Sequence, residues 1–210
     1  MLEDKTAALH GPSANMSAAD AGDDRRQNQR HLAVFRVGKM MTGTGQEFCL
    51  IRNISAGGLM ANIYSPHAVG EPVEIEFKAG AVVAGKIVWT RENRIGVAFD
   101  EPIDVHHVLS NSAGDSEVLQ ARLPRIELRC PARLRVGARY HRVELCDISQ
   151  GGAKIAIEND LNVGDEVVLS VDGLPPQAGT IRWYGDHRAG IAFNTAIPFG
   201  QIAAWTTRHY

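Results

Sequence analysis

The sequence predicts an all-β protein made of two tandem six-stranded antiparallel β-barrels, each followed by a short C-terminal helix. The chain has 210 residues, which is enough for two domains of about 100 residues that each bury a core. Residues 53–100 align with residues 147–194 without a gap, at a constant offset of 94 (147 against 53). Short alternating or β-branched segments recur at intervals of roughly 8 to 12 residues, which is typical of an antiparallel sandwich or barrel.

The two copies agree at residues that form turns and at residues that form a core. The stretch NISAGG, which begins at Asn53, matches DISQGG, which begins at Asp147, and IGVAF matches AGIAF near the end of each copy. Upstream, FRVG at 35–38 matches LRVG at 134–137 at an offset of 99 instead of 94. The larger offset predicts five extra residues in the first copy, within MMTGTG, because glycines suit the tip of a hairpin.

The strands and helices follow from local patterns. The strand segments are VEIEF, AGKIVW and RIGVAF in the first copy, and RVELCDI, AKIAI, EVVLSV and GTIRW in the second. After the last strand of each copy, PIDVHHVLSNS and IPFGQIAAWTTRHY have apolar residues at helical spacing. We therefore expect a disordered tail at 1–22, a first barrel domain at 23–110, a linker at 111–121 and a second barrel domain at 122–210.

Composition excludes several classes of protein. No apolar run approaches the roughly 18 residues of a membrane helix, so we expect no membrane insertion. The first residues lack the basic start and apolar stretch of a signal peptide, which predicts a cytoplasmic location. The three cysteines show no CxxC spacing, which argues against a disulfide framework and a zinc site. We expect all three to be reduced and mostly packed.

Charge limits the class of partner. The formal net charge is −2, so no global field attracts long nucleic acid, and we expect neither DNA nor RNA as a partner. An RNA-binding small barrel would need exposed aromatics interleaved with Lys and Arg, but only 6% of residues are aromatic. Of the 22 basic residues 17 are Arg, a bias toward the planar fork that grips phosphate or stacks on a base.

Two motifs recur in the same order in both copies. Each copy begins with Arg-x-x-x-Arg and continues, after one predicted hairpin, with Asn/Asp-x-Ser-x-x-Gly. In both halves the chain resembles the PilZ domain family, whose members commonly bind the bacterial second messenger cyclic di-GMP through these two motifs. The resemblance implies that cyclic di-GMP is the ligand. The implied ligand-binding residues are Arg25, Arg26, Arg30, Asn53, Ser55 and Gly58 in the first copy, and Arg125, Arg129, Asp147, Ser149 and Gly152 in the second.

Physical chemistry supports these residue types. An Arg fork can bond two phosphate oxygens, or O6 and N7 of guanine, and its flat face can stack on the purine. Asn or Asp can accept hydrogen bonds from the guanine edge, and a Ser hydroxyl can bond a phosphate or a base nitrogen. We interpret the glycines, Gly58 and Gly152, as leaving room for the ligand at the backbone and permitting positive φ at a tight turn.

The two sites differ in the residue before the first motif. The resemblance implies that the ligand often binds as an intercalated pair of molecules, and that an extra Arg just before the first motif favours this form. Arg25 is in that place in the first copy, whereas Pro124 precedes Arg125 in the second. We therefore expect a single ligand molecule, or weaker binding, at the second site.

The sequence contains no set of residues typical of an enzyme. No nucleophile with its base, pair of carboxylates or metal set recurs at a plausible spacing, so we expect a binding module with no catalytic residue, cofactor or metal. We interpret His106 and His107 as helix surface, because adjacent residues of a helix point in different directions. Trp89 and Trp183 are expected to pack in the core.

Function is predicted from the resemblance. With no attached output domain, such a receptor changes conformation on binding cyclic di-GMP and signals through an unidentified protein effector that controls motility, biofilm formation, polysaccharide production or virulence. The alternative is a PilZ-fold interaction scaffold that binds no nucleotide. The first hairpin of the second copy is also basic, which favours a solvated face and leaves open a surface for an anion or a partner; its arginines are Arg133, Arg135, Arg139 and Arg142.

Overall fold

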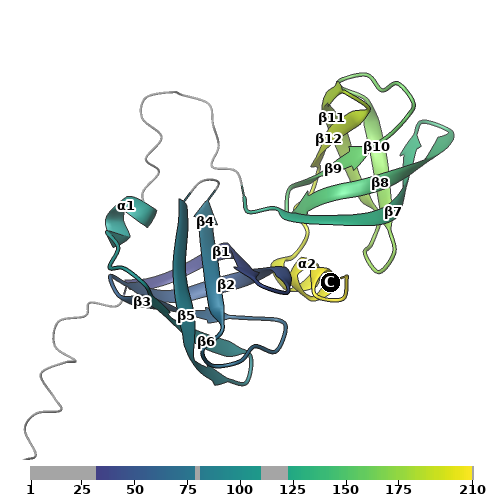
Figure 1. Ribbon diagram of the computed structural model, residues 1–210. Helices are drawn as coiled ribbons and strands as arrows, with labels where there is room; N and C mark the ends of the chain where they lie inside the picture. The colour runs from purple at the N-terminus through teal and green to yellow at the C-terminus, as the bar shows by residue number, and fades with distance from the viewer. Residues whose placement is uncertain (1–31, 79–80, 110–122, 210) are drawn as a thin grey trace, which may run out of the picture. The chain divides into compact units, whose positions relative to one another are not determined.

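The computed structural model describes residues 32–78, 81–109 and 123–209. These residues form two closed antiparallel barrels of six strands each, and a short helix follows the last strand of each barrel (Figure 1). The predicted fold class is thereby confirmed. The expected tail at 1–22 and linker at 111–121 lie outside the described residues.

The first barrel contains strands β1 to β6 and is followed by helix α1. Its strands pair in the order β1-β2-β3-β6-β5-β4, and pairing of β1 with β4 closes the barrel. The segment RIGVAF, expected to be a strand, coincides with β6. The elements are β1 (Leu32–Thr42), β2 (Gly45–Ser55), β3 (Gly58–Asn62), β4 (Pro72–Lys78), β5 (Ala81–Arg91), β6 (Arg94–Phe99) and α1 (Val105–Leu109).

The second barrel repeats this topology with strands β7 to β12 and is followed by helix α2. Its strands pair in the order β10-β11-β12-β9-β8-β7, and pairing of β7 with β10 closes it. The segment EVVLSV coincides with β10. The elements are β7 (Ile126–Val136), β8 (Arg139–Ser149), β9 (Gly152–Ala156), β10 (Glu166–Val171), β11 (Gln177–Gly185), β12 (Arg188–Phe193) and α2 (Phe199–Thr206).

The first hairpins of the two barrels have equal length, so the predicted insertion of five residues is wrong. Strands β7 and β8 begin and end 94 residues after β1 and β2 (126 against 32, and 149 against 55). The FRVG match had aligned Phe35, which is 72% exposed, with Leu134, which is fully buried. A shift by an odd number of residues exchanges the two faces of a strand, so this match paired outward with inward positions.

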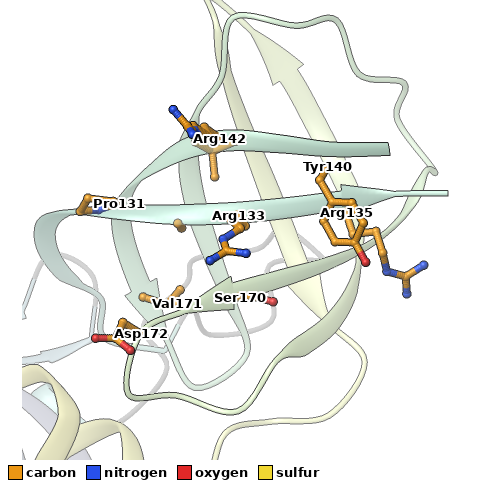
Figure 2. A pocket seen from close by; sticks show the side chains of 10 residues that line it. Pro131, Arg133, Arg135, Tyr140, Arg142, Ser170, Val171 and Asp172 are labelled. Carbon is orange, nitrogen blue, oxygen red and sulfur yellow. The ribbon is translucent and has the colours of Figure 1, made fainter. Parts of the chain in front are cut away.

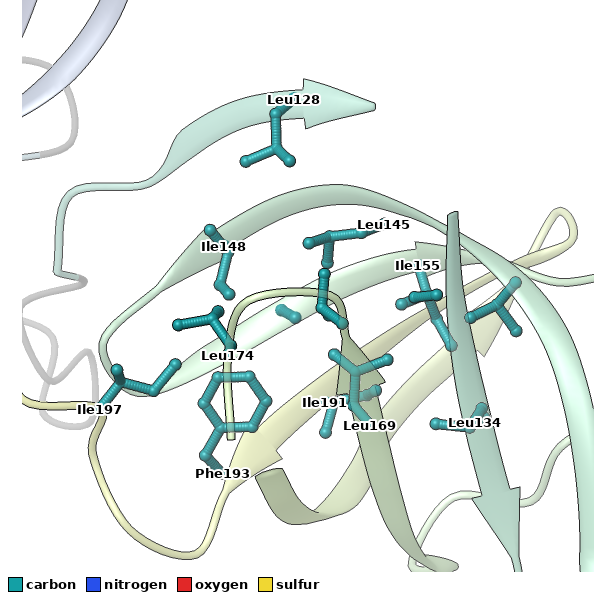
Figure 3. Packing of buried hydrophobic residues seen from close by; sticks show 14 of the residues in the cluster. Leu128, Leu134, Leu145, Ile148, Ile155, Leu169, Leu174, Ile191, Phe193 and Ile197 are labelled. Atoms are coloured by element: carbon teal, nitrogen blue, oxygen red, sulfur yellow. The ribbon is translucent and has the colours of Figure 1, made fainter. Parts of the chain in front are cut away.

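Each barrel interior is filled by alternate residues of its strands. In the second barrel Leu134, Leu145 and Ile148 are fully buried, and they pack with residues of the other strands (Figure 3). In the first barrel Ile51, Ile75 and further residues of the other strands form the equivalent cluster. Such β-branched and branched residues fit a pleated, buried surface, so side chains occupy the interior and polar groups point outward.

The three cysteines are free thiols. Cys49 is fully buried, and this burial, with the nearby charge of Glu47, raises the pKa of its thiol to about 12. Burial also raises the pKa of Cys130 and of Cys146, which are only partly covered. Neither of the helices in the described part of the chain is long and apolar enough to cross a bilayer.

Truncation of a central core side chain will destabilise the second barrel. Leu145→Ala removes a fully buried side chain, so we expect the free energy of unfolding, measured by denaturant titration, to fall by about 2–5 kcal/mol. Val163→Ala is the matched control, because Val163 is 66% exposed. An equal effect of the two substitutions would contradict the described packing.

The thiols will differ in their reactivity. Because only the thiolate is nucleophilic, Cys49 should remain unmodified by iodoacetamide at a pH well below its raised pKa of about 12, whereas Cys130 and Cys146 should react slowly. Mass spectrometry of the native protein checks this order, with the unfolded protein as the control in which all three react. Preferential labelling of Cys49 in the native state would show that its burial is wrong.

Candidate ligand-binding site

A row of residues crosses four strands on the outer face of the second barrel. Asp147 on β8 pairs with Lys154 on β9, Lys154 pairs with Gly190 on β12, and Gly190 pairs with Trp183 on β11. Directly paired residues lie on the same face of a sheet. The row therefore brings a carboxylate, an ammonium group and an indole onto one face.

Asp147 is the centre of a network of ion pairs. Its side chain is only 8% exposed, and it accepts a hydrogen bond of 2.6 Å from Nη1 of Arg125 at Oδ1. Lys154 Nζ lies 2.9 Å from its other oxygen, Oδ2. Two cations thus share one carboxylate, and the buried charge is compensated on both oxygens. The sum of these three charges is positive, so the site favours an anion.

Arg125 is held in place but keeps donors free. It lies directly before β7, and its side chain is 43% exposed. A guanidinium has five N–H donors, and the bond to Asp147 uses a donor of Nη1 only. Asp147 thereby orients the fork while the remaining donors can bind another group.

Arg129 is much less constrained. It lies on β7, its side chain is 81% exposed, and its Nη1 is 3.8 Å from Oε1 of Glu144. An exposed pair at this distance contributes at most about 1 kcal/mol to stability. Arg129 can therefore leave Glu144 at little cost.

Ser149 and Gly152 flank the turn between β8 and β9, and Ser55 and Gly58 flank its counterpart in the first barrel. The Ser hydroxyl donates to the Gly carbonyl in both turns, at 3.3 Å in the second barrel and 3.2 Å in the first. The repeated Asn/Asp-x-Ser-x-x-Gly motif therefore builds one local structure twice. Each Ser is buried, so its first role is to close the turn.

The conformational reason expected for these glycines is wrong. Neither Gly58 nor Gly152 has φ in the left-handed region. A Cβ on Gly58 would lie 2.4 Å from the carbonyl oxygen of Val97, and a Cβ on Gly152 would lie 2.3 Å from that of Ile191. The backbone of the neighbouring strand excludes a side chain at both positions, whether or not a ligand is bound.

The tryptophans are on the outer face, so their predicted place in the core is wrong. Trp89 is 36% exposed and Trp183 is 45% exposed. A Cβ on Gly96 or on Gly190 would lie 2.0 Å from Nε1 of the facing tryptophan. Each indole therefore rests against a glycine of the adjacent strand and leaves its other side to solvent.

Comparison with known proteins identifies the family. A family model described as PilZ domain matches residues 24–111 and 120–205. The chain belongs to the PilZ domain family. PilZ domain proteins are binding receptors and regulators, which agrees with the prediction of a binding module and not an enzyme. A search of curated proteins finds no match.

Solved structures resemble this PilZ chain at low sequence identity. PlzA of Borreliella burgdorferi, solved in complex with c-di-GMP, is 13% identical, with 88% of this chain and 95% of that chain covered and a TM-score of 0.37. YcgR of Escherichia coli, also solved with c-di-GMP, is 13% identical, with coverage of 83% and 82% and a TM-score of 0.34. The Bacillus subtilis inhibitor of motility is 10% identical, with coverage of 84% and 95% and a TM-score of 0.33.

The first PilZ barrel has the same row without its charges. Asn53, Met60, Gly96 and Trp89 are paired in the order of the second row. Asn and Met thus replace the ion pair of Asp147 with Lys154. The arginines expected to serve this site, Arg25, Arg26 and Arg30, lie outside the described residues.

The offset of 94 also shows that the arginine motifs are not at equivalent positions. Arg129 on β7 corresponds to Phe35 on β1 (129 against 35). The ring of Phe35 is covered by the guanidinium of Arg52, at 4.3 Å from the ring centroid. The first copy therefore has its two arginines ahead of β1, whereas the second has Arg129 within the strand.

Sequence reasoning missed Lys154 and the outward position of Trp183. A signal for the tryptophan was present, because Trp and Gly recur seven residues apart in both copies, at Trp89 and Gly96 and at Trp183 and Gly190. Across a tight hairpin this spacing sets the two residues opposite each other. Lys154 had no such signal, because the first copy has Met60 at that position.

A polar cluster on the first PilZ barrel resembles a catalytic triad without its chemistry. His67 contacts Ser65 through Nε2 at 3.0 Å and Glu71 through Nδ1 at 3.1 Å. The Ser65 hydroxyl, however, donates to Oε2 of Glu47 at 2.7 Å. Because a carboxylate already accepts this proton and would repel an oxyanion, the cluster ties the loop after β3 to β2. The described residues contain no group of three metal-ligating side chains suited to a metal ion.

Two neighbouring glycines will separate packing from ligand contact. Gly152→Ala places a Cβ against the Ile191 carbonyl, whereas Gly151→Ala meets only Leu123 Cδ1, at 3.9 Å. Without ligand we expect Gly152→Ala to lower the free energy of unfolding by about 1–3 kcal/mol and Gly151→Ala to change it by less than about 0.5 kcal/mol. Equal stability of both variants in thermal or denaturant unfolding would refute the packing explanation.

Proposed function

We propose that this PilZ chain is a cyclic di-GMP receptor that signals through a protein effector. The observation that carries the proposal is the fork of Arg125, held at Asp147 on the outer face and aligned with Lys154 and Trp183 in one row. These groups fit an anion that also has flat aromatic bases. The positions of Arg125 and Asp147 match the two motifs that PilZ domains commonly use for this ligand.

The second site offers a separate contact for each part of the ligand. The free donors of Arg125 and the ammonium of Lys154 suit phosphate oxygens or the O6 and N7 atoms of guanine. The exposed side of the Trp183 ring suits stacking on guanine. A carboxylate has about four acceptor sites, so Asp147 can accept from the guanine edge while it keeps both cations. Arg129 is free to close over the ligand because its pair with Glu144 is weak.

The first site is proposed to bind the ligand with the arginines of the first copy. Arg26 and Arg30 precede β1 and would approach Asn53 and Ser55 when the ligand is present, with Arg25 favouring an intercalated pair of ligand molecules. Asn53 keeps an acceptor oxygen without a charge. The second site, preceded by Pro124, is proposed to bind a single molecule.

Signalling would follow from ordering of the arginine segments. A ligand shifts a conformational equilibrium only by its difference in affinity for the two states. Ordering of the exposed Arg129 against the ligand supplies this difference and changes the surface that an effector meets. The effector is a protein, in a process such as motility, biofilm formation, polysaccharide production or virulence control.

Calorimetric titration with cyclic di-GMP tests the receptor proposal. We expect saturable heat with the intact chain, and loss of the second-site contribution with Arg125→Ala/Arg129→Ala, by about 10- to 100-fold in affinity, because each arginine supplies charged hydrogen bonds. Arg26→Ala/Arg30→Ala should remove the first-site contribution. Arg208→Ala, which removes an exposed arginine outside both sites, is the control.

The outcomes separate receptor from scaffold. No heat with the intact, folded chain would favour the scaffold that binds no nucleotide. Unchanged binding in both site variants would place the ligand elsewhere. Trp183→Ala supplies a further check, because loss of stacking should weaken the second site by about 1–3 kcal/mol per base without removing any charge.

A further inference from the structure

The outer face of β8, β7 and β10 in the second barrel forms a basic surface apart from the row described above. We call it the arginine face; its members are Arg133, Arg135, Tyr140 and Arg142. These residues line a groove of about 580 Å³ together with Ser170, Asp172 and neighbouring residues (Figure 2). Tyr140 is 72% exposed, whereas the side chains that fill the barrel core are buried.

Strand register sets like charges directly opposite each other on this face. Arg133 on β7 pairs with Arg142 on β8 and, on its other side, with Ser170 on β10. Figure 2 shows these three residues across neighbouring strands. Like charges directly opposite on adjacent strands are destabilising. The positive charge of the arginine face therefore destabilises the folded protein when no partner is bound.

The first barrel neutralises the equivalent position. Lys39 corresponds to Arg133 at the offset of 94 (133 against 39), and its Nζ forms a 2.6 Å ion pair with Oε2 of Glu76, the residue opposite it on β4. Ser170 takes the place of Glu76, and Arg142 takes the place of Phe48. The barrel can thus be built with this charge compensated, so the excess is a property of the second barrel alone.

Within the described residues, no carboxylate pairs with Arg133 or Arg142 at ion-pair distance. Arg135 donates from Nη1 to the carbonyl of Gly137 at 3.1 Å, which leaves its charge uncompensated. The sequence contains five arginines and no Asp or Glu between residues 128 and 143. The basic surface ends at Glu144 and Asp172. Glu144 is paired with Pro131, and Asp172 follows Val171, which is paired with Ala132 next to Pro131.

We propose that the arginine face is the docking surface for an acidic segment of the effector protein. This inference rests on the proposed function only for the statement that the partner is the effector. Arg forks pair with carboxylates through two parallel hydrogen bonds. Arg and Tyr are also the residue types that contribute most to protein interfaces. Carboxylates that enter the groove relieve the repulsion between Arg133 and Arg142. The partner that complements this charge is therefore a segment rich in Asp or Glu.

A nucleic acid fits this face less well. The basic surface is confined to one hairpin, and acidic residues border it at Glu144 and Asp172. A phosphate backbone extends in both directions with regularly spaced charge, so it would meet these carboxylates. A short acidic peptide can end before them.

The experiment measures fluorescence anisotropy of a labelled peptide of alternating Glu and Ala, with the same peptide carrying Gln in place of Glu as the uncharged probe. We expect the Glu peptide to bind the full chain and the Gln peptide not to bind. Arg133→Gln/Arg142→Gln should weaken binding by at least about tenfold. Arg182→Gln/Arg208→Gln removes the same charge from exposed positions elsewhere and should leave binding unchanged.

Parallel titrations with cyclic di-GMP keep the two proposals separate. The Arg133→Gln/Arg142→Gln variant should bind the dinucleotide as the intact chain does, which also shows that it is folded. Absence of peptide binding in a chain that binds cyclic di-GMP would overturn the docking surface alone. Tighter binding of a labelled single-stranded DNA, lost in the same variant, would replace the acidic peptide with nucleic acid and overturn the inference. Equal weakening of peptide binding by Arg133→Gln/Arg142→Gln and by Arg182→Gln/Arg208→Gln would show that the peptide responds only to net charge, which also overturns the inference.

Discussion

The alternation of side chains across closed six-stranded sheets determines where this PilZ chain can bind anything. Six short strands enclose an interior that their own inward residues fill, so Leu134, Leu145 and Ile148 leave no room for a ligand inside. Every outward position is then available for polar groups, and residues paired by register share a patch of surface. A set of residues paired across strands is consequently the unit of a candidate binding site on this fold, and the second barrel has two such sets, which share β8.

Backbone packing explains why the motif residues recur even though the two rows differ in charge. Gly58 and Gly152 allow a strand carbonyl to approach within a distance that any Cβ would block, and the adjacent Ser hydroxyl closes the same turn in both copies. Much of the Asn/Asp-x-Ser-x-x-Gly motif is therefore required by the fold. Functional discrimination is left to the first residue of the motif and to its cross-strand neighbour, which are Asp147 with Lys154 in one barrel and Asn53 with Met60 in the other.

The sequence was sufficient to predict the two barrels, their six strands and terminal helices, because the repeat at a constant offset and the turn residues are local signals. It was insufficient where a conclusion required knowing which way a side chain points. The FRVG match aligned Phe35, which points outward, with Leu134, which points inward. The tryptophans were assigned to the core because they are apolar, although their spacing of seven residues from a glycine places the two residues opposite each other. The pair of Arg125 with Asp147 joins residues 22 positions apart, and only strand register reveals that Lys154 completes it.

The two barrels of this PilZ chain differ in fixed charge, which indicates that they have different binding functions. On the first barrel Lys39 is neutralised by Glu76, and its site row contains no ion pair. On the second barrel Arg125 and Lys154 both contact Asp147. Arg133 is paired with Arg142, and no carboxylate of the described residues lies at ion-pair distance from either. Because duplicated barrels have the same structural requirements, charge that only one of them retains is not needed for folding. Arg129 lies on β7 and Asp147 on β8, so a ligand that orders Arg129 acts on the same two strands that present the arginine face.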